Sequence, residues 1–281
     1  MRAEPVTGPV AFHGEGPVWS AAWGGLRWVD LLAGDVLSLA PDGSAQRRHV
    51  GPRLTAMRPR REGGAVLALE RGFALEDADG SVRELPEVLD EGLRFNDGGC
   101  DPDGRFWCGS MAYDQRAGAA AMHRLDPDGT VHHCFGDLTI SNGLEWSPDG
   151  TKAYYTDTPT ARVDVFDYGR DSGLSDRRPF AVLPEGAGWP DGLTVDAEGG
   201  VWVAVYGGAC VRRYGPDGAL DAVVEVSTPK PTACTFGGDD LDVLYITSTR
   251  EDLPAGTEPL AGALFAVRSG VRGQPARIFA G

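Results

Sequence analysis

Short apolar runs separated by polar turns make up the pattern of this chain. Runs of strand length, rich in aliphatic, aromatic and β-branched side chains, recur along it, with examples at Leu26–Leu32, Ala65–Leu69 and Leu244–Ser248. Such composition and length are typical of β-strands. A 3.6-residue apolar period is not sustained anywhere, so helices are not expected. The pattern therefore predicts an all-β fold.

Turn signals between these runs support the same interpretation. A Pro-Asp-Gly triplet begins at Pro41, Pro102, Pro127, Pro148 and Pro216. The 40 Gly and 20 Pro residues sit largely at such turns rather than in low-complexity tracts. Such frequent turns are typical of a fold made of many short antiparallel strands.

A longer period organises the strands. Six strand-like stretches each begin with a small polar or acidic residue, at successive spacings of 40, 41, 46, 49 and 41 residues. We call these the opening residues: Glu15, Thr55, Asn96, Asn142, Asp191 and Thr232. Periods of 40–50 residues built from short strands are typical of propeller blades. We therefore predict a six-bladed β-propeller, one domain over residues 1–281, with blades at 10–50, 51–92, 93–135, 136–186, 187–227 and 228–281.

Ring closure predicts how the ends of the chain are used. Val6–Phe12 and Ala276–Ala280 are apolar enough to be strands, and one blade should be assembled from both termini, because an open ring leaves two blade faces unburied. The longest irregular segments, Ala112–Met122, Glu185–Trp189 and Arg250–Ala261, are expected to form loops around the rim of a pocket.

Composition narrows the classes of function. The net charge of -15 disfavours nucleic-acid binding, and the densest basic stretch, Arg58–Arg61, is short. No run approaches the ~20 apolar residues of a membrane span, and the start of the chain lacks a signal-peptide pattern. The five cysteines are scattered and odd in number, which favours free thiols over a disulfide framework. We therefore expect a cytoplasmic protein without nucleic-acid or membrane partners.

The opening residues are the candidate site. Taken singly, Glu15 could be a surface turn residue, Asn142 a hairpin Asn-Gly turn and Asp191 one more Pro-Asp-Gly turn. Their shared register favours a common site over three unrelated turns, because closure of the ring would direct all six opening residues toward one axis. Two carboxylates and an amide oxygen form a hard oxygen shell with room for water and substrate, which suits Ca²⁺, Mg²⁺ or Mn²⁺ and favours catalysis.

Other catalytic motifs are absent from the sequence. The five histidines and five cysteines show no His-x-x-x-His or Cys-x-x-Cys spacing, which argues against a nitrogen or thiolate zinc site. No Gly-x-Ser-x-Gly elbow occurs, and Cys108-Gly-Ser-Met has no base at a predictable spacing, so nucleophilic Ser or Cys catalysis has little support.

With these residues in view, the chain resembles the senescence marker protein, gluconolactonase and luciferin-regenerating enzyme family. The resemblance extends over essentially the whole chain. It is carried by Gly14–Trp19, Arg94–Met111, Ile140–Ser147, Tyr154–Thr158, Val165–Tyr168, Pro190–Gly199, Trp202–Gly208 and Gly262–Val267.

The resemblance implies a six-bladed propeller and a divalent-metal-dependent hydrolase that opens sugar lactones to aldonic acids. The family's metal ligands match Glu15, Asn142 and Asp191. Its substrate contacts match Arg94 and Asn96. A further acidic substrate contact matches Asp114, where relatives can carry Glu and where the segment Ala112–Met122 is shorter than in animal members.

These implications give one mechanism and two alternatives. One divalent ion, Ca²⁺ first with Zn²⁺, Mn²⁺ or Mg²⁺ as alternatives, would polarise the carbonyl of a sugar γ- or δ-lactone, and Asp191 would also be the catalytic base. The alternatives are a calcium-binding or scaffold propeller without turnover, and a metal-dependent hydrolase of another ester or an organophosphate. The sequence leaves the sugar and the oligomeric state open.

Overall fold

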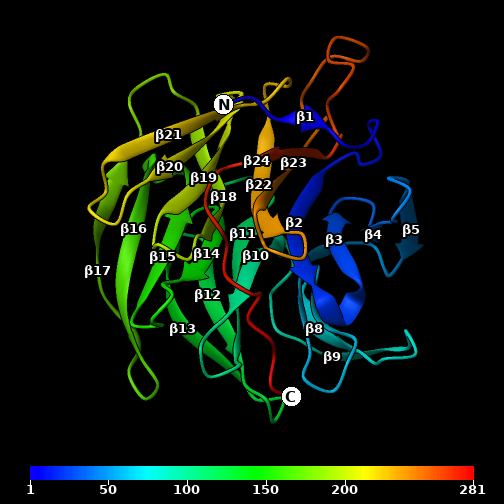
Figure 1. Ribbon diagram of the computed structural model, residues 1–281. Coiled ribbons are helices and arrows are strands. Elements are labelled where there is room, and N and C mark those ends of the chain that lie inside the picture. The colour runs from blue at the N-terminus through cyan, green and yellow to red at the C-terminus, as the bar shows by residue number, and fades with distance from the viewer.

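Six antiparallel four-stranded sheets form a closed ring in the computed structural model, which describes residues 1–281 (Figure 1). The predicted six-bladed β-propeller is thus confirmed. The only helical segments are two short 3-10 turns at Ala21–Trp23 and Thr158–Thr160. No helix is long and apolar enough to cross a membrane.

The blades follow the chain in order, and the first strand of each lies innermost. Blade 1 comprises β2 (Gly14–Ser20), β3 (Gly25–Asp30), β4 (Asp35–Leu39) and β5 (Ala45–His49), and blade 2 comprises β6 (Leu54–Pro59), β7 (Ala65–Leu69), β8 (Gly72–Glu76) and β9 (Val82–Glu87). Blade 3 comprises β10 (Leu93–Cys100), β11 (Phe106–Ala112), β12 (Ala120–Leu125) and β13 (Val131–Leu138), and blade 4 comprises β14 (Ser141–Trp146), β15 (Lys152–Asp157), β16 (Arg162–Gly169) and β17 (Gly173–Val182). Blade 5 comprises β18 (Trp189–Val195), β19 (Val201–Tyr206), β20 (Cys210–Tyr214) and β21 (Leu220–Glu225), and blade 6 comprises β22 (Pro231–Gly237), β23 (Val243–Ser248), β24 (Phe265–Arg268) and β1 (Glu4–Pro5).

Blade 6 closes the ring with both ends of the chain, as predicted. Glu4 and Pro5 of β1 pair with Ala266 and Phe265 of β24. The prediction of a strand over Val6–Phe12 is wrong, because the chain bends over residues 6–9 and Pro9 has no N–H to donate to a ladder.

The end of the chain crosses the ring instead of forming the strand predicted at Ala276–Ala280. We call residues 271–281 the C-terminal strap, and Figure 1 shows it in red, running down to the end of the ring opposite the loop at 250–261. Phe279 N–H donates to Pro59 O at 2.8 Å, and Ala280 N–H donates to Gly104 O at 2.9 Å. Because its partners change from blade to blade, no single strand runs alongside it.

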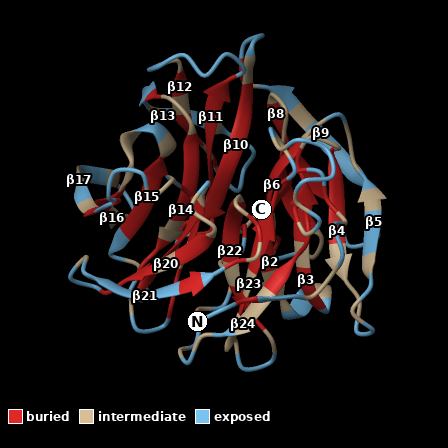
Figure 2. Cartoon of the chain, turned by 90° about the horizontal axis from the view of Figure 1, so that it is seen from above, coloured by how far each residue is buried: buried red, intermediate tan, exposed pale blue.

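The core lies between the blades. Buried residues concentrate on the inner strands, whereas outer strands such as β5, β9 and β21 are largely exposed (Figure 2). Large fully buried side chains fill the space between neighbouring sheets: Trp28, Trp107, Trp146 and Trp202. All five cysteines are free thiols. This packing holds the inner strands rigidly. We call the end of the axis where the inner strands begin its upper end, and the end crossed by the C-terminal strap its lower end.

Candidate metal and substrate site

A β-bulge occurs at the opening residue of every inner strand. The register shifts lie between Glu15 and Val18, Leu54 and Ala56, Phe95 and Gly98, Ser141 and Leu144, Pro190 and Leu193, and Pro231 and Cys234. A bulge re-aims a side chain out of the regular pleat. All six opening residues are buried, and neighbouring inner strands pack against each other around the ring. Their polar side chains therefore meet at the upper end of the axis.

Three of the predicted site residues form one hydrogen-bonded chain. Arg94 Nη1 donates to Asn96 Oδ1 at 2.6 Å, and Asn96 Nδ2 donates to Asn142 Oδ1 at 3.0 Å. Asn96 Nδ2 also reaches Ser141 O at 2.8 Å, while Asn142 Nδ2 donates to Thr158 Oγ1 at 2.8 Å. These bonds fix the orientation of both amides and hold Asn142 Oδ1 beside the axis.

The two predicted carboxylate ligands are buried and close enough to repel each other. Glu15 Oε2 accepts the Gly16 N–H at 3.0 Å, whereas Asp191 Oδ1 is buried and has no hydrogen-bond partner. Burial raises the pKa of Glu15 to about 8, with a further contribution from the Asp97 carboxylate. Burial, and then the charge of Glu15, raise the pKa of Asp191 well above its usual range. A compensating positive charge between them would relieve both effects.

The donor set fits a hard divalent cation. Carboxylate and amide oxygens are the ligands that such ions prefer, and the unpartnered Asp191 Oδ1 is a buried acceptor in need of a partner. No group of three or more His, Cys, Asp or Glu side chains suited to a metal occurs anywhere in the fold, and the opening residues instead combine two carboxylates with amide oxygens. Glu15, Asn142 and Asp191 are therefore the residues that could hold one ion.

The remaining predicted residues occupy different surroundings. Thr55 and Thr232 use their hydroxyls on backbone carbonyls, donating to Ala68 O at 3.1 Å and Gly14 O at 2.5 Å. Asp114 lies in the exposed turn between β11 and β12, where it forms an ion pair with Arg116 at 3.0 Å. The structure thus joins Arg94 and Asn96 to the axial set but places Asp114 apart from it.

Several residues at the site were not singled out from the sequence. Asp97, in the bulge after Asn96, is buried and acts electrostatically on both Glu15 and Asp191. His13 lies beside Glu15, and its Nδ1 contacts Glu251 Oε2 at 3.0 Å. The signal that could have found His13 is its place two residues before an opening residue, on the same side of the strand.

We call the solvent-facing side of the upper end of the axis the mouth. The loop at 250–261, predicted to lie at the rim, lies there. Its Glu251 carbonyl accepts from Lys230 Nζ at 2.8 Å, and this ammonium lies 4.7 Å from the centre of the Tyr206 ring. Two other aromatic side chains at the mouth are about half exposed, Tyr113 at 47% and Trp189 at 49%. The upper end of the axis thus combines buried polar side chains with aromatic side chains closer to solvent.

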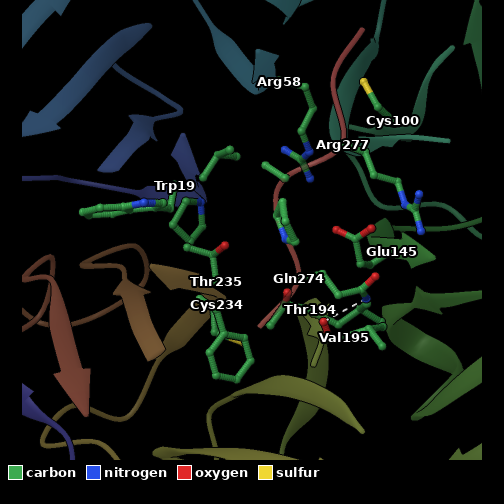
Figure 3. Close-up of a pocket in the computed structure, with 16 residues that line it drawn as sticks. Trp19, Arg58, Cys100, Glu145, Thr194, Val195, Cys234, Thr235, Gln274 and Arg277 are labelled. Atoms are coloured by element: carbon green, nitrogen blue, oxygen red, sulfur yellow. Dashed lines mark hydrogen bonds between the residues drawn. The ribbon is translucent and has the colours of Figure 1, made fainter. Parts of the chain in front are cut away.

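The lower end of the axis is closed. Figure 3 shows Gln274 and Arg277 of the C-terminal strap beside Glu145 and Arg58. Gln274 Nε2 donates to Trp146 O and Val195 O, each at 3.1 Å, so the strap is tied to blades 4 and 5. A substrate must therefore approach from the mouth that the opening residues face.

Comparisons with known proteins agree with this geometry. Residues 13–250 match the family model described as the SMP-30/Gluconolactonase/LRE-like region. A 6-deoxy-6-sulfogluconolactonase of Pseudomonas putida is 37% identical, over 95% of each chain. A pentonolactonase, XacC, of Haloferax volcanii is 36% identical, over 93% of this chain and 92% of the relative.

Solved structures give the same result. A luciferin-regenerating enzyme superposes with a TM-score of 0.91 at 30% identity, over 99% of both chains. A regucalcin of Agrobacterium tumefaciens, described as a calcium-binding protein, superposes with a TM-score of 0.91 at 29% identity, over 99% of this chain and 97% of that one.

Proposed function

Because the chain belongs to the SMP-30/gluconolactonase/LRE-like family, we propose that it hydrolyses a sugar lactone to the aldonic acid at the upper end of the propeller axis. One observation carries this proposal. Two buried carboxylates, one with an unpartnered oxygen, and two oriented amides meet at the end of the axis opposite the C-terminal strap.

Glu15, Asn142 and Asp191 would hold one divalent ion, with Ca²⁺ the first candidate and Zn²⁺, Mn²⁺ and Mg²⁺ the alternatives. When bound, such an ion supplies a Lewis acid that polarises the lactone carbonyl and stabilises the oxyanion, an effect worth several kcal/mol. The oxygen-only donor set supports Ca²⁺ over the softer ions.

Asp191 is the proposed catalytic base. It would take a proton from the water that attacks the lactone carbonyl, which produces a tetrahedral intermediate. When this intermediate collapses, the ring C–O bond breaks and Asp191 returns the proton to the departing ring oxygen. Its unpartnered Oδ1 supports this role, because no protein group competes with water for that oxygen.

Arg94, near the start of β10, is the proposed contact for a substrate hydroxyl. Its Nη1 is used within the protein, on Asn96 Oδ1 and Phe95 O, which leaves Nη2 for a substrate hydroxyl. Asn96 would mainly orient Arg94 and Asn142, since its amide bonds to both. Asp114 remains a proposed contact on the family resemblance, and it would have to leave Arg116 to reach a substrate.

A turnover screen tests the proposal. Protein dialysed against a chelator is assayed with aldono-1,4- and 1,5-lactones in the presence of Ca²⁺, Zn²⁺, Mn²⁺ or Mg²⁺, and initial rates are corrected for spontaneous opening. The panel includes pentonolactones and a sulfonated gluconolactone, which the names of the relatives suggest. We expect metal-dependent opening of at least one lactone. Failure to open any of them would overturn the proposal.

The screen also decides between the alternatives. The description of one structural relative as a calcium-binding protein favours a non-catalytic Ca²⁺-binding propeller as the second candidate. That function predicts tight Ca²⁺ binding by calorimetry without turnover of lactones, aryl esters or organophosphates. Turnover of esters or organophosphates in place of lactones would indicate the third candidate.

A further inference from the structure

A second ring of residues surrounds the mouth above the opening residues. It consists of the residues two positions before them: His13, Arg53, Arg94, Ile140, Trp189 and Lys230. Side chains two apart on a strand project to the same side, so this mouth ring lies one step nearer to solvent. Its basic members belong to the adjacent blades 6, 1, 2 and 3, and its two apolar members to blades 4 and 5. The mouth therefore has a basic side formed by four blades and an apolar side formed by two.

Two of the four basic residues, His13 and Lys230, are bound to Glu251. His13 Nδ1 contacts the Glu251 carboxylate at 3.0 Å, and Lys230 Nζ donates to the Glu251 carbonyl at 2.8 Å. The charges of His13, Arg94 and Lys230 in turn lower the pKa of Glu251, with the hydrogen bond from His13 as the largest cause. Glu251 thus occupies the side of the mouth formed by blades 6 and 1.

Arg53 and Arg94, on blades 2 and 3, have no carboxylate partner. Arg94 Nη1 bonds to Phe95 O and Asn96 Oδ1, and Arg53 Nη1 bonds to Leu32 O and Pro52 O, each at 2.8 Å. Arg53 Nε is buried without any partner. This is notable in a chain where acidic residues outnumber Lys and Arg by 41 to 26. Arg94 is buried and Arg53 is half-buried, and a guanidinium withdrawn from water without an anion is costly. The pair is therefore arranged for a negative charge that comes from outside the chain.

The two guanidinium groups lie on one wall. Their inner strands, β6 and β10, are neighbours in the ring (Figure 2). Burial lowers the pKa of Arg94, and the charge of Arg53 contributes in the same direction, whereas Tyr113, Glu251 and Glu15 act in the opposite direction without pairing with it. Tyr113 lies beside both and donates its hydroxyl to Glu70. Blade 2 faces blade 5 across a ring of six, so Arg53 lies opposite Asp191.

We propose that the lactone carries an anionic substituent, which Arg53 and Arg94 bind at the end of the substrate remote from the ester bond. This inference rests on the proposed lactonase function. The guanidinium fork pairs with two oxygens of a carboxylate, sulfonate or phosphate, so the shared feature is an oxyanion. Arg53 is the residue that determines specificity, because Arg94 is also part of the hydrogen-bonded chain to Asn142.

Matched substrates test this inference. The kcat/KM values are measured for glucono-1,4-lactone, for glucaro-1,4-lactone, which has a carboxylate at C6, and for 6-phosphogluconolactone, with the parent, Arg53→Gln and the control Arg83→Gln. Arg83 is an exposed arginine of β9. We expect the parent to prefer an anionic lactone by about 10-fold or more and Arg53→Gln to lose that preference, about 1.4 kcal/mol. Arg83→Gln should keep the parent's efficiency on all three lactones, and Arg53→Gln should lose far more efficiency on the anionic lactones than on the neutral one.

Different failures have different meanings. Equal efficiency of the parent on neutral and anionic lactones, or an equal loss on both in Arg53→Gln, overturns the inference and leaves the lactonase proposal intact. If no lactone is opened, the proposed function fails. The inference that Arg53 and Arg94 bind an anionic group is then tested by ligand binding. Calorimetry then compares 6-phosphogluconate with gluconate on chelator-dialysed parent and Arg53→Gln. Binding of the phosphorylated compound that is not tighter in the parent, or not weakened in the variant, overturns it.

Discussion

Asp191 differs from the other opening residues in having a carboxylate oxygen that no protein group engages. Glu15 accepts a backbone N–H, Asn96 and Asn142 bond to each other, and Thr232 donates to a carbonyl. Among the opening residues, only Asp191 has a buried side-chain oxygen without a hydrogen-bond partner. Asp191 is therefore the one side chain that we propose both as a metal ligand and as the base that transfers a proton.

We accordingly expect Asp191→Asn to be the most damaging conservative change. The amide keeps the size and one carbonyl oxygen but cannot take a proton from water. Turnover at saturating metal should fall at least ~10²-fold, the lower end for loss of a general base. Initial rates near neutral pH, corrected for spontaneous opening, measure this, with exposed Asp239→Asn as the control. Activity within a few-fold of the parent would rule out Asp191 as the base, and recovery on adding metal would reduce it to a ligand.

Glu15→Gln should separate metal binding from folding. Removing a carboxylate that burial disfavours in its charged form should leave the metal-free protein at least as stable, while Ca²⁺ affinity falls about 10-fold or more. Asn142→Ala should weaken affinity in the same direction. Isothermal titration and thermal unfolding measure the two effects, with exposed Glu62→Gln as the control. Unchanged affinity in Glu15→Gln would remove Glu15 from the ligand set.

The residues that sequence could identify are those that share a repeat. Glu15, Asn142 and Asp191 recur at equivalent points, so ring closure alone brings them together. Glu251 has no such register, because it comes from a loop and meets His13 only once blade 6 closes on blade 1. Asp97 was missed because its neighbour Asn96 holds the equivalent position, and the bulge that contains both residues has no sequence signature of its own.

At the scale of elements, small residues after the opening residues let the inner strands approach closely. A Cβ added at Gly143 would lie 2.6 Å from Leu193 N and 2.9 Å from Asp191 O. A Cβ at Gly192 would lie 2.8 Å from Ala233 Cα. The bulges of β14, β18 and β22 therefore fit against one another, and the position of Asp191 depends on the glycine that follows Asn142.

Gly143→Ala tests this coupling between strands. The methyl group would push β18, which carries Asp191, away from β14, so we expect a loss of about 1–3 kcal/mol in unfolding free energy together with reduced kcat. Gly51→Ala is the matched control, because a Cβ there meets nothing within 4 Å, and it should stay within about 0.5 kcal/mol. Denaturant unfolding and lactone turnover measure both effects. A fully active Gly143→Ala protein would show that Asp191 is positioned independently of β14.

At the scale of the whole molecule, two devices hold the ring closed, and sequence predicted only one. The blade built from both termini follows from the need to bury two open faces. The C-terminal strap does not, because its contacts join residues about two hundred positions apart, such as Phe279 with the buried cluster containing Phe73 and Phe106. Its apolar composition suggested a strand, but blades 2, 3, 4 and 5 each accept only one or two of its bonds.

Phe279→Ala should therefore weaken the ring without affecting the chemistry. Phe279 is 1% exposed, so truncation should cost about 3–5 kcal/mol of unfolding free energy. The adjacent Ile278 is 41% exposed, and Ile278→Ala should cost only about 0.5 kcal/mol. Because the strap lies at the end of the axis opposite the mouth, both variants should keep parental kcat and Ca²⁺ affinity well below their melting temperatures. Chemical denaturation and initial rates on the same samples measure this, and a Phe279→Ala protein that is stable but slow would show that the strap acts on the site through the axis.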